Sequence, residues 1–238
     1  MRRLNLLATE VDSVLIHGLN NTGKTHLLGS VMAYEKQFGR TVYVNMKGEP
    51  INSLLSNDLT DVDLIEVAKI EEIIELCTKL PDVHCMTLDS VQRLGELAAD
   101  KITGGAYAVG AKEDHGRDWN KLKFEVFKAL NKLIANCKVF VAVCPTRLHE
   151  NQITKAVRAV PDLPGAGEVI QSRFNFVGFL EATVLTPTVV ERKIDFEPRI
   201  DVLTRFNGKR SVGKALKVAK GPDCWLPIKE EMDKAIHG

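Results

Sequence analysis

Residues Gly18-Leu19-Asn20-Asn21-Thr22-Gly23-Lys24-Thr25 match the pattern GxxxxGK[ST] at every fixed position. An apolar run at 14–16 precedes this stretch, and apolar residues recur at helical spacing directly after it. The motif therefore lies between a predicted strand and a predicted helix, which is the context that a phosphate-binding P-loop requires. This context predicts an α/β fold with an anion site at the end of its first strand.

Each residue type in this stretch suits the binding of a polyphosphate. The two glycines allow a tight turn that aims backbone N–H groups inward, and the helix beginning near Lys24 adds the positive end of its dipole. We expect Lys24 to bring a positive charge to the β- and γ-phosphates and Thr25 to bind Mg²⁺ through its hydroxyl. The predicted nucleotide-binding residues are Gly18, Asn20, Asn21, Thr22, Gly23, Lys24, Thr25 and His26.

The composition indicates a chain with little overall charge. The 238 residues include 32 basic and 31 acidic side chains, so bulk electrostatics point to no class of partner. The charges are unevenly distributed, because acidic residues dominate 58–82 and basic residues dominate 199–220. The length suits a single core over 1–238, with a lead-in arm at 1–10 and a basic C-terminal extension at 205–238.

The cysteines and the apolar runs indicate the cellular compartment in which we expect the protein. The five cysteines contain no CxxC pair and most lie in apolar runs, which is typical of reduced core cysteines. No stretch resembles a signal peptide, and no apolar run approaches the roughly 20 residues that span a bilayer. We therefore expect a cytoplasmic protein without a membrane partner.

Three predicted strands end in polar residues that suit a nucleotide site. Residues 83–88 form an apolar run that ends at Asp89, which we expect to approach Mg²⁺ directly or through water. The strand over 41–46 is followed by Glu49, and ligands bind at the carboxyl edge of an open α/β sheet. The strand over 139–144 precedes Thr146, which is either a sensor of the γ-phosphate or a strand-end cap.

The rest of the chain alternates predicted elements with two long loops. We predict an edge strand over 62–67 and helices over 69–80, 91–101, 228–236 and a stretch N-capped by Asp118. Loops are predicted over 102–117 and 148–172, and loops of that length in a compact domain are usually functional or disordered. Strands over 174–184, 189–194 and 200–206 would close the sheet as an antiparallel meander.

This order of parts, from the P-loop through Leu88-Asp89-Ser90 to the terminal meander, resembles the RecA-like ATPases. Over roughly residues 15–227 it is more closely similar to the compact phage-type AAA nucleotide-binding proteins proposed as single-strand annealing recombinases. The resemblance implies a three-layer RecA-like P-loop NTPase fold in the α/β class, with a mainly parallel central sheet and an antiparallel C-terminal meander. Its cofactors would be ATP and Mg²⁺.

The same resemblance implies a function and a set of partners. The protein would be a Mg²⁺-dependent ATPase, stimulated by DNA, that binds single-stranded DNA and promotes annealing or recombination. It would form a homo-oligomeric ring or filament with nucleotide at the subunit interface, in the host cytoplasm if the chain is phage-encoded. A single-strand-binding protein is a further expected partner.

Roles for individual residues also follow from the resemblance. Lys24, Glu49 and Asp89 would be catalytic, with Glu49 orienting the attacking water, and Thr25 and Asp89 would bind the metal. The family's second strand usually ends in an acid-x-Glu pattern, whereas Glu49 here lies four residues beyond Asn45. Because cations hold single strands through their phosphates, the predicted DNA-binding residues are Lys155, Arg158, Arg173, Lys209, Arg210 and Lys214. Any one of the last three could instead supply a cation to a neighbouring subunit.

Two other classes of function fit the P-loop. A small-molecule kinase could use Arg147 and Arg158 in a substrate lid, but the meander and the basic extension would then have no evident role. A nucleotide-switched adaptor, such as a helicase loader, would bind ATP tightly and turn it over slowly.

Overall fold

The computed structural model describes residues 11–54, 56–104, 119–150, 155–163, 166–167, 169–186, 189–197, 201–206, 215–218 and 222–237. Its strands are β1 (Asp12–Gly18), β2 (Thr41–Met46), β3 (Val62–Val67), β4 (Val83–Asp89), β5 (Cys137–Glu150), β6 (Val157–Pro161), β7 (Phe176–Thr186), β8 (Val189–Asp195), β9 (Arg205–Phe206) and β10 (Leu216–Val218). Its α-helices are α1 (Lys24–Glu35), α2 (Ile70–Lys79), α3 (Val91–Thr103), α4 (Trp119–Ala135) and α5 (Leu226–His237). Short 3-10 turns are η1 (Lys36–Phe38), η2 (Asn52–Leu54), η5 (Ile170–Arg173) and η6 (Pro222–Cys224).

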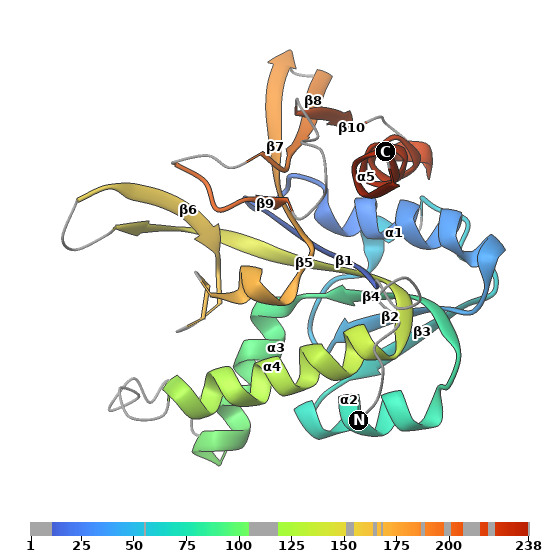
Figure 1. Cartoon of the computed structure of the whole chain (residues 1–238), viewed down its shortest axis with the longest axis vertical. Coiled ribbons are helices and arrows are strands. Elements are labelled where there is room, and N and C mark those ends of the chain that lie inside the picture. The colour runs from blue at the N-terminus through green and yellow to red at the C-terminus, as the bar shows by residue number, and fades with distance from the viewer. Residues whose placement is uncertain are drawn as a thin grey trace.

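The strands form one mixed sheet in the order β10-β8-β7-β1-β5-β4-β2-β3 (Figure 1). From β7 to β3 all neighbouring strands are parallel, while β8 and β10 add antiparallel pairs at one edge. Two further strands lie off this path, since β6 pairs with β5 and β9 pairs with β7. The predicted α/β sheet, mainly parallel with an antiparallel C-terminal side, is confirmed.

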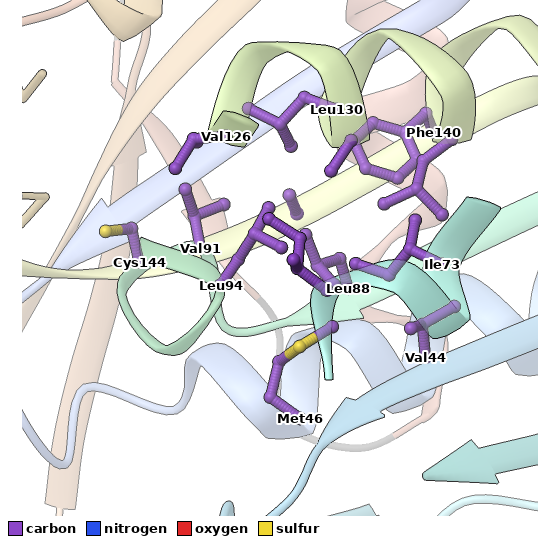
Figure 2. Packing of buried hydrophobic residues seen from close by; sticks show 14 of the residues in the cluster. Val44, Met46, Ile73, Leu88, Val91, Leu94, Val126, Leu130, Phe140 and Cys144 are labelled. Carbon is purple, nitrogen blue, oxygen red and sulfur yellow. The ribbon is translucent and has the colours of Figure 1, made fainter. Parts of the chain in front are cut away.

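Helices cover both faces of the sheet, and the alternation of side chains along β1 explains why. Val14 and Ile16 are fully buried on the face covered by α1 and α5, and Leu15 is fully buried on the opposite face. That opposite face is covered by α2, α3 and α4, which pack residues such as Ile73, Leu94 and Leu130 against the strands (Figure 2). Because β1 is apolar on both sides, it forms the centre of a three-layer structure.

The C-terminal segment packs against α1. Trp225 is fully buried, where its backbone N–H donates to Ser30 Oγ at 2.9 Å and its Nε1 donates to Glu35 Oε1 at 3.1 Å. Lys229 of α5 donates to Asp12 Oδ2 at 2.7 Å. The stretch predicted as an extension therefore contributes β9 and β10 to the sheet, and α5 and a core tryptophan to the layer that packs with α1.

The structure corrects the predicted loop at 148–172. β5 continues to Glu150 and pairs with β6, with His149 opposite Arg158 in an antiparallel ribbon. This outer half of β5 was missed because it leaves the buried sheet, so its side chains are polar. The predicted meander strand over 200–206 is also shorter, comprising β9 and one bridge between Val202 and Ala159.

Several expectations fall on residues whose structure is not described. These are the arm at 1–10, the central part of the first predicted loop with the Asp118 cap at 105–118, and the cations Lys209, Arg210 and Lys214. The start of that loop is helical, because α3 extends through Thr103. No helix within the described ranges combines the length and the apolar content needed to cross a bilayer.

Candidate nucleotide-binding site

The P-loop turns between the end of β1 at Gly18 and the start of α1 at Lys24. A Cβ atom on Gly18 would lie 2.5 Å from the Leu180 carbonyl oxygen of β7, so only glycine lets β7 pack this closely. Gly23 has a φ of +97°, a backbone conformation that glycine adopts at no steric cost. The two fixed glycines of the motif are therefore required by packing and by backbone conformation, respectively.

The Lys24 ammonium lies over the P-loop itself. Its Nζ donates to the carbonyl oxygens of Gly18 at 2.9 Å and Leu19 at 2.7 Å, and burial lowers the pKa of this group. Both acceptors are neutral carbonyls. An anion held by the loop would give Lys24 a charged acceptor within the same reach, and such hydrogen bonds are stronger than those to neutral oxygens.

Thr25 and Asp89 come together at the ends of α1 and β4. Thr25 Oγ1 donates to Asp89 Oδ2 at 2.8 Å, and Tyr43 OH donates to the same carboxylate oxygen at 3.4 Å. Burial is the main cause that raises the pKa of Asp89 to about 6, and the nearby negative charge of Glu49 adds to it. A hydroxyl and a buried carboxylate side by side are the oxygen ligands that Mg²⁺ takes, so these residues fit the metal.

Glu49 lies beside the Asp89 strand end. Gly48, with a φ of +95°, turns the chain after β2, and Ser90 Oγ then donates to Glu49 Oε1 at 2.8 Å. Ser90 follows Asp89 directly and also accepts from Arg93 N–H, which caps α3. The carboxylates of Glu49 and Asp89 are thus presented by the neighbouring strands β2 and β4 at the carboxyl edge of the sheet.

Thr146 contacts His17, a residue whose role the sequence did not reveal. Thr146 Oγ1 lies 2.9 Å from His17 Nδ1, and His17 Nε2 lies 2.6 Å from the Leu203 carbonyl oxygen. Burial lowers the pKa of His17 to about 4, so the ring is neutral at pH 7. Because a carbonyl oxygen only accepts, Nε2 holds the ring proton and Thr146 donates its hydroxyl hydrogen to Nδ1.

His17 therefore connects three elements at the base of the P-loop. It belongs to β1, and its two partners belong to β5 and to the segment at 201–206. The fixed tautomer means that Thr146 offers its oxygen, rather than its hydrogen, to a group in the site. The only sequence signal for this contact was a histidine in an apolar strand directly before Gly18.

The remaining predicted nucleotide-binding residues lie along the loop and the first turn of α1. Asn20 and Asn21 are exposed, and Thr22 Oγ1 donates to the Leu19 carbonyl oxygen at 2.9 Å. His26 faces the chain after η2, where its Nδ1 lies 3.1 Å from Ser56 Oγ. A residue that the sequence did not single out, Arg192 of β8, donates from Nε to the Thr22 carbonyl oxygen at 2.9 Å.

The described members of the predicted DNA-binding set are not gathered in one place. Lys155 is exposed at the β5–β6 ribbon and pairs with Glu150 at 3.5 Å. Arg158 lies on β6, where its Nη2 donates to the Val202 carbonyl oxygen at 3.1 Å. Arg173 lies elsewhere, with its guanidinium carbon 4.4 Å from the centre of the Phe127 ring of α4. Two of the three described cations therefore belong to the ribbon.

Comparison with known proteins supports the fold. No protein-family model and no curated protein matches this sequence. Among solved structures, the chain is similar to a DnaB-like replicative helicase, whose structure was reported together with its interactions with primase, at a TM-score of 0.51 and 13% identity. The match covers 89% of this chain and 56% of the helicase chain, so this protein corresponds to little more than half of that one. The chain therefore has a RecA-like α/β fold.

Proposed function

We propose that this protein binds and hydrolyses ATP with Mg²⁺ and acts on single-stranded DNA in annealing or recombination. The observation that carries the proposal is the convergence of Lys24, Thr25, Glu49 and Asp89 at one edge of the sheet, with Thr25 and Asp89 joined at 2.8 Å. These residues come from the P-loop with the start of α1, the turn after β2 and the end of β4. Such a set supplies a cation, a hydroxyl and two carboxylates to a polyphosphate site.

Hydrolysis at this site would need no covalent intermediate. The P-loop N–H groups and Lys24 position the phosphates and balance their charge, while Thr25 and Asp89 hold the metal. When bound, Mg²⁺ neutralises charge that develops on the phosphate oxygens. Glu49 orients the attacking water through the carboxylate oxygen that Ser90 does not occupy. In this scheme Ser90 fixes the direction of Glu49.

The β5–β6 ribbon supports a nucleic-acid role. Figure 1 shows β5 and β6 extending together beyond the packed helices. Thr146 lies where β5 passes the P-loop, and the exposed cation of Lys155 lies beyond the far end of the same strand. Lysine and arginine side chains hold single strands through their phosphates, without regard to sequence. Nucleotide state at the P-loop and strand binding at the ribbon would then be linked through one β-strand.

The proposal includes the setting in which the protein works. It would act in the cytoplasm as a homo-oligomeric ring or filament, with nucleotide bound between subunits and a single-strand-binding protein as an additional partner. Lys209, Arg210 or Lys214 would supply the trans-acting cation, or contact DNA.

Steady-state ATP turnover tests the proposal. Turnover is measured with Mg²⁺ alone, with single-stranded DNA and with duplex DNA, and Lys24→Ala serves as the blank. We expect stimulation by single strands that is absent in Lys24→Ala and reduced in Lys155→Ala. Turnover that ignores every nucleic acid, together with no ATP-dependent strand binding, contradicts the DNA part of the proposal.

A nucleotide-switched adaptor is the second candidate, and exposed apolar side chains favour it. Leu148 and Val157 on the β5–β6 ribbon are 73% and 53% exposed, and Val184 and Leu185 near the end of β7 are 69% and 58% exposed. Apolar residues on projecting hairpins suit contact with a protein partner. Tight ATP binding with little turnover, and with no response to DNA, would favour this reading.

A further inference from the structure

Arg192 brings a second cation to the P-loop from a distant part of the chain. It lies on β8, 170 residues from Thr22, and its Nε donates to the Thr22 carbonyl oxygen at 2.9 Å. A Cβ atom on Gly23 would lie 2.9 Å from the same Nε and 3.6 Å from the guanidinium carbon. The guanidinium therefore lies directly against the bare Cα of the second P-loop glycine.

The surroundings of Arg192 on β8 offer it no carboxylate. Neighbouring strand residues point to opposite faces, and both Glu191 and Lys193 lie on the other face, where they pair at 3.2 Å. The cross-strand partners of Arg192 are Ala182 on β7 and Val218 on β10, which are apolar. Within the described residues, its single hydrogen-bond partner is the Thr22 carbonyl oxygen, and its charge also opposes the rise in the pKa of the Cys224 thiol that burial causes.

Arginine has five N–H donors, and this contact uses only the one on Nε. The two Nη groups carry the four remaining N–H donors and share the positive charge of the guanidinium. Among the described residues no carboxylate pairs with this half-buried guanidinium, so an anion bound at the P-loop would give its Nη groups a charged acceptor. The adjacent P-loop is the part of the chain built to hold such an anion.

We propose that Arg192 is a nucleotide-binding residue, whose Nε fixes the Thr22 carbonyl while its Nη groups bind the phosphate chain of a nucleoside triphosphate. The proposal rests on the nucleotide-binding part of the proposed function and adds a contact supplied by the antiparallel side of the sheet. It gives β8 a role in the site, and it gives Gly23 a second reason to lack a side chain.

Nucleotide affinity tests this assignment. Binding of a fluorescent ATP analogue with Mg²⁺, and its displacement by ATP, is measured for the wild type, Arg192→Ala, Arg192→Gln, Lys193→Ala and Lys24→Ala. Loss of a charge-assisted hydrogen bond predicts affinity about 10- to 100-fold weaker in both Arg192 variants. Lys193→Ala removes the same charge from the opposite face of β8, and we expect its affinity to stay within about twofold of the wild type.

The glutamine variant separates phosphate binding from support of the loop. Its side-chain amide can still donate to the Thr22 carbonyl but carries no charge, so wild-type affinity in Arg192→Gln would overturn the proposal. Equal losses in Arg192→Ala and Lys193→Ala would overturn it as well, since bulk charge would explain both. Thermal unfolding without nucleotide checks that each variant is folded. If the wild type binds no nucleotide at all, the proposed function fails, whereas loss in Lys24→Ala alone refutes only the role of Arg192.

Discussion

Asp89→Asn is expected to stabilise the nucleotide-free protein while removing its response to Mg²⁺. Asp89 is only 5% exposed, and its pKa is raised from 3.8 to about 6, mainly by burial. Each tenfold change in acid strength is worth about 1.4 kcal/mol, so the buried carboxylate reduces the free energy of unfolding by about 3 kcal/mol at pH 7. Asparagine can still accept from Thr25 but carries no charge, so this value is the upper limit of the gain.

The pH dependence gives the prediction its sign. A raised pKa means that the folded protein binds the proton more tightly than the unfolded chain, so the penalty is absent at low pH, grows as the pH rises from about 4, and is complete above about pH 6. His17 acts in the opposite direction, because its pKa is lowered to about 4 and its protonation destabilises the fold as the pH falls. The contribution of Asp89 is therefore obtained from the difference in the free energy of unfolding between the variant and the wild type at each pH.

Chemical denaturation with EDTA present is the assay. We expect Asp89→Asn to exceed the wild type by up to about 3 kcal/mol at pH 7 and by about 0.5 kcal/mol at pH 4. Mg²⁺ and ATP together should then stabilise the wild type but not the variant. A variant less stable than the wild type at pH 7, or a difference that does not change with pH, would refute the reasoning.

Three further substitutions, two of them with a matched control variant, test the P-loop turn, the His17 contacts and the C-terminal segment. Gly18→Ala places a Cβ atom 2.5 Å from a backbone oxygen, so we expect a loss of about 1–3 kcal/mol of stability and a loss of nucleotide binding. Gly104→Ala meets nothing within 4 Å but has a φ of +65°, so it should cost about 1–2 kcal/mol through backbone strain alone and leave nucleotide binding intact. His17→Ala removes the partners of the buried Leu203 carbonyl and of the partly buried Thr146 hydroxyl, so it should cost more than about 2 kcal/mol in urea unfolding. Thr146→Val keeps the contact between His17 and Leu203 and should cost less. Trp225→Phe removes the donor to buried Glu35 and should lower stability by about 1–3 kcal/mol, so unchanged unfolding would mean that the C-terminal segment does not support α1.

The parts that were predictable from sequence are those where one local pattern decides the outcome. The strand over 41–46 was placed correctly because it is a run rich in β-branched and apolar residues. The strand over 62–67 was also placed correctly, because a short run that combines apolar residues with acids is typical of a sheet edge. Glu49 and Asp89 were predicted to lie at one edge of the sheet because the carboxyl ends of parallel strands meet at the same edge. The prediction of the P-loop depended only on its motif and on the strand and helix on either side of it.

What the sequence could not reveal depends on contacts between distant residues. The outer half of β5 is mostly polar because it pairs only with β6, so residues such as His149 and Glu150 were predicted to be part of a loop. His17 and Arg192 reach partners more than 100 residues away, and nothing in their immediate neighbours marks those contacts. Both depend on how β7, β8 and the segment at 201–206 fold back onto the P-loop, which is a property of the tertiary structure.

Calorimetric titration of ATP, with and without Mg²⁺, into the wild type and Lys24→Ala tests the central claim most directly. The account predicts saturable binding of one ATP per chain in the wild type, strengthened by Mg²⁺ and lost in Lys24→Ala. No binding to the wild type, or equal binding to the variant, would contradict the assignment of residues 18–25 as the nucleotide site.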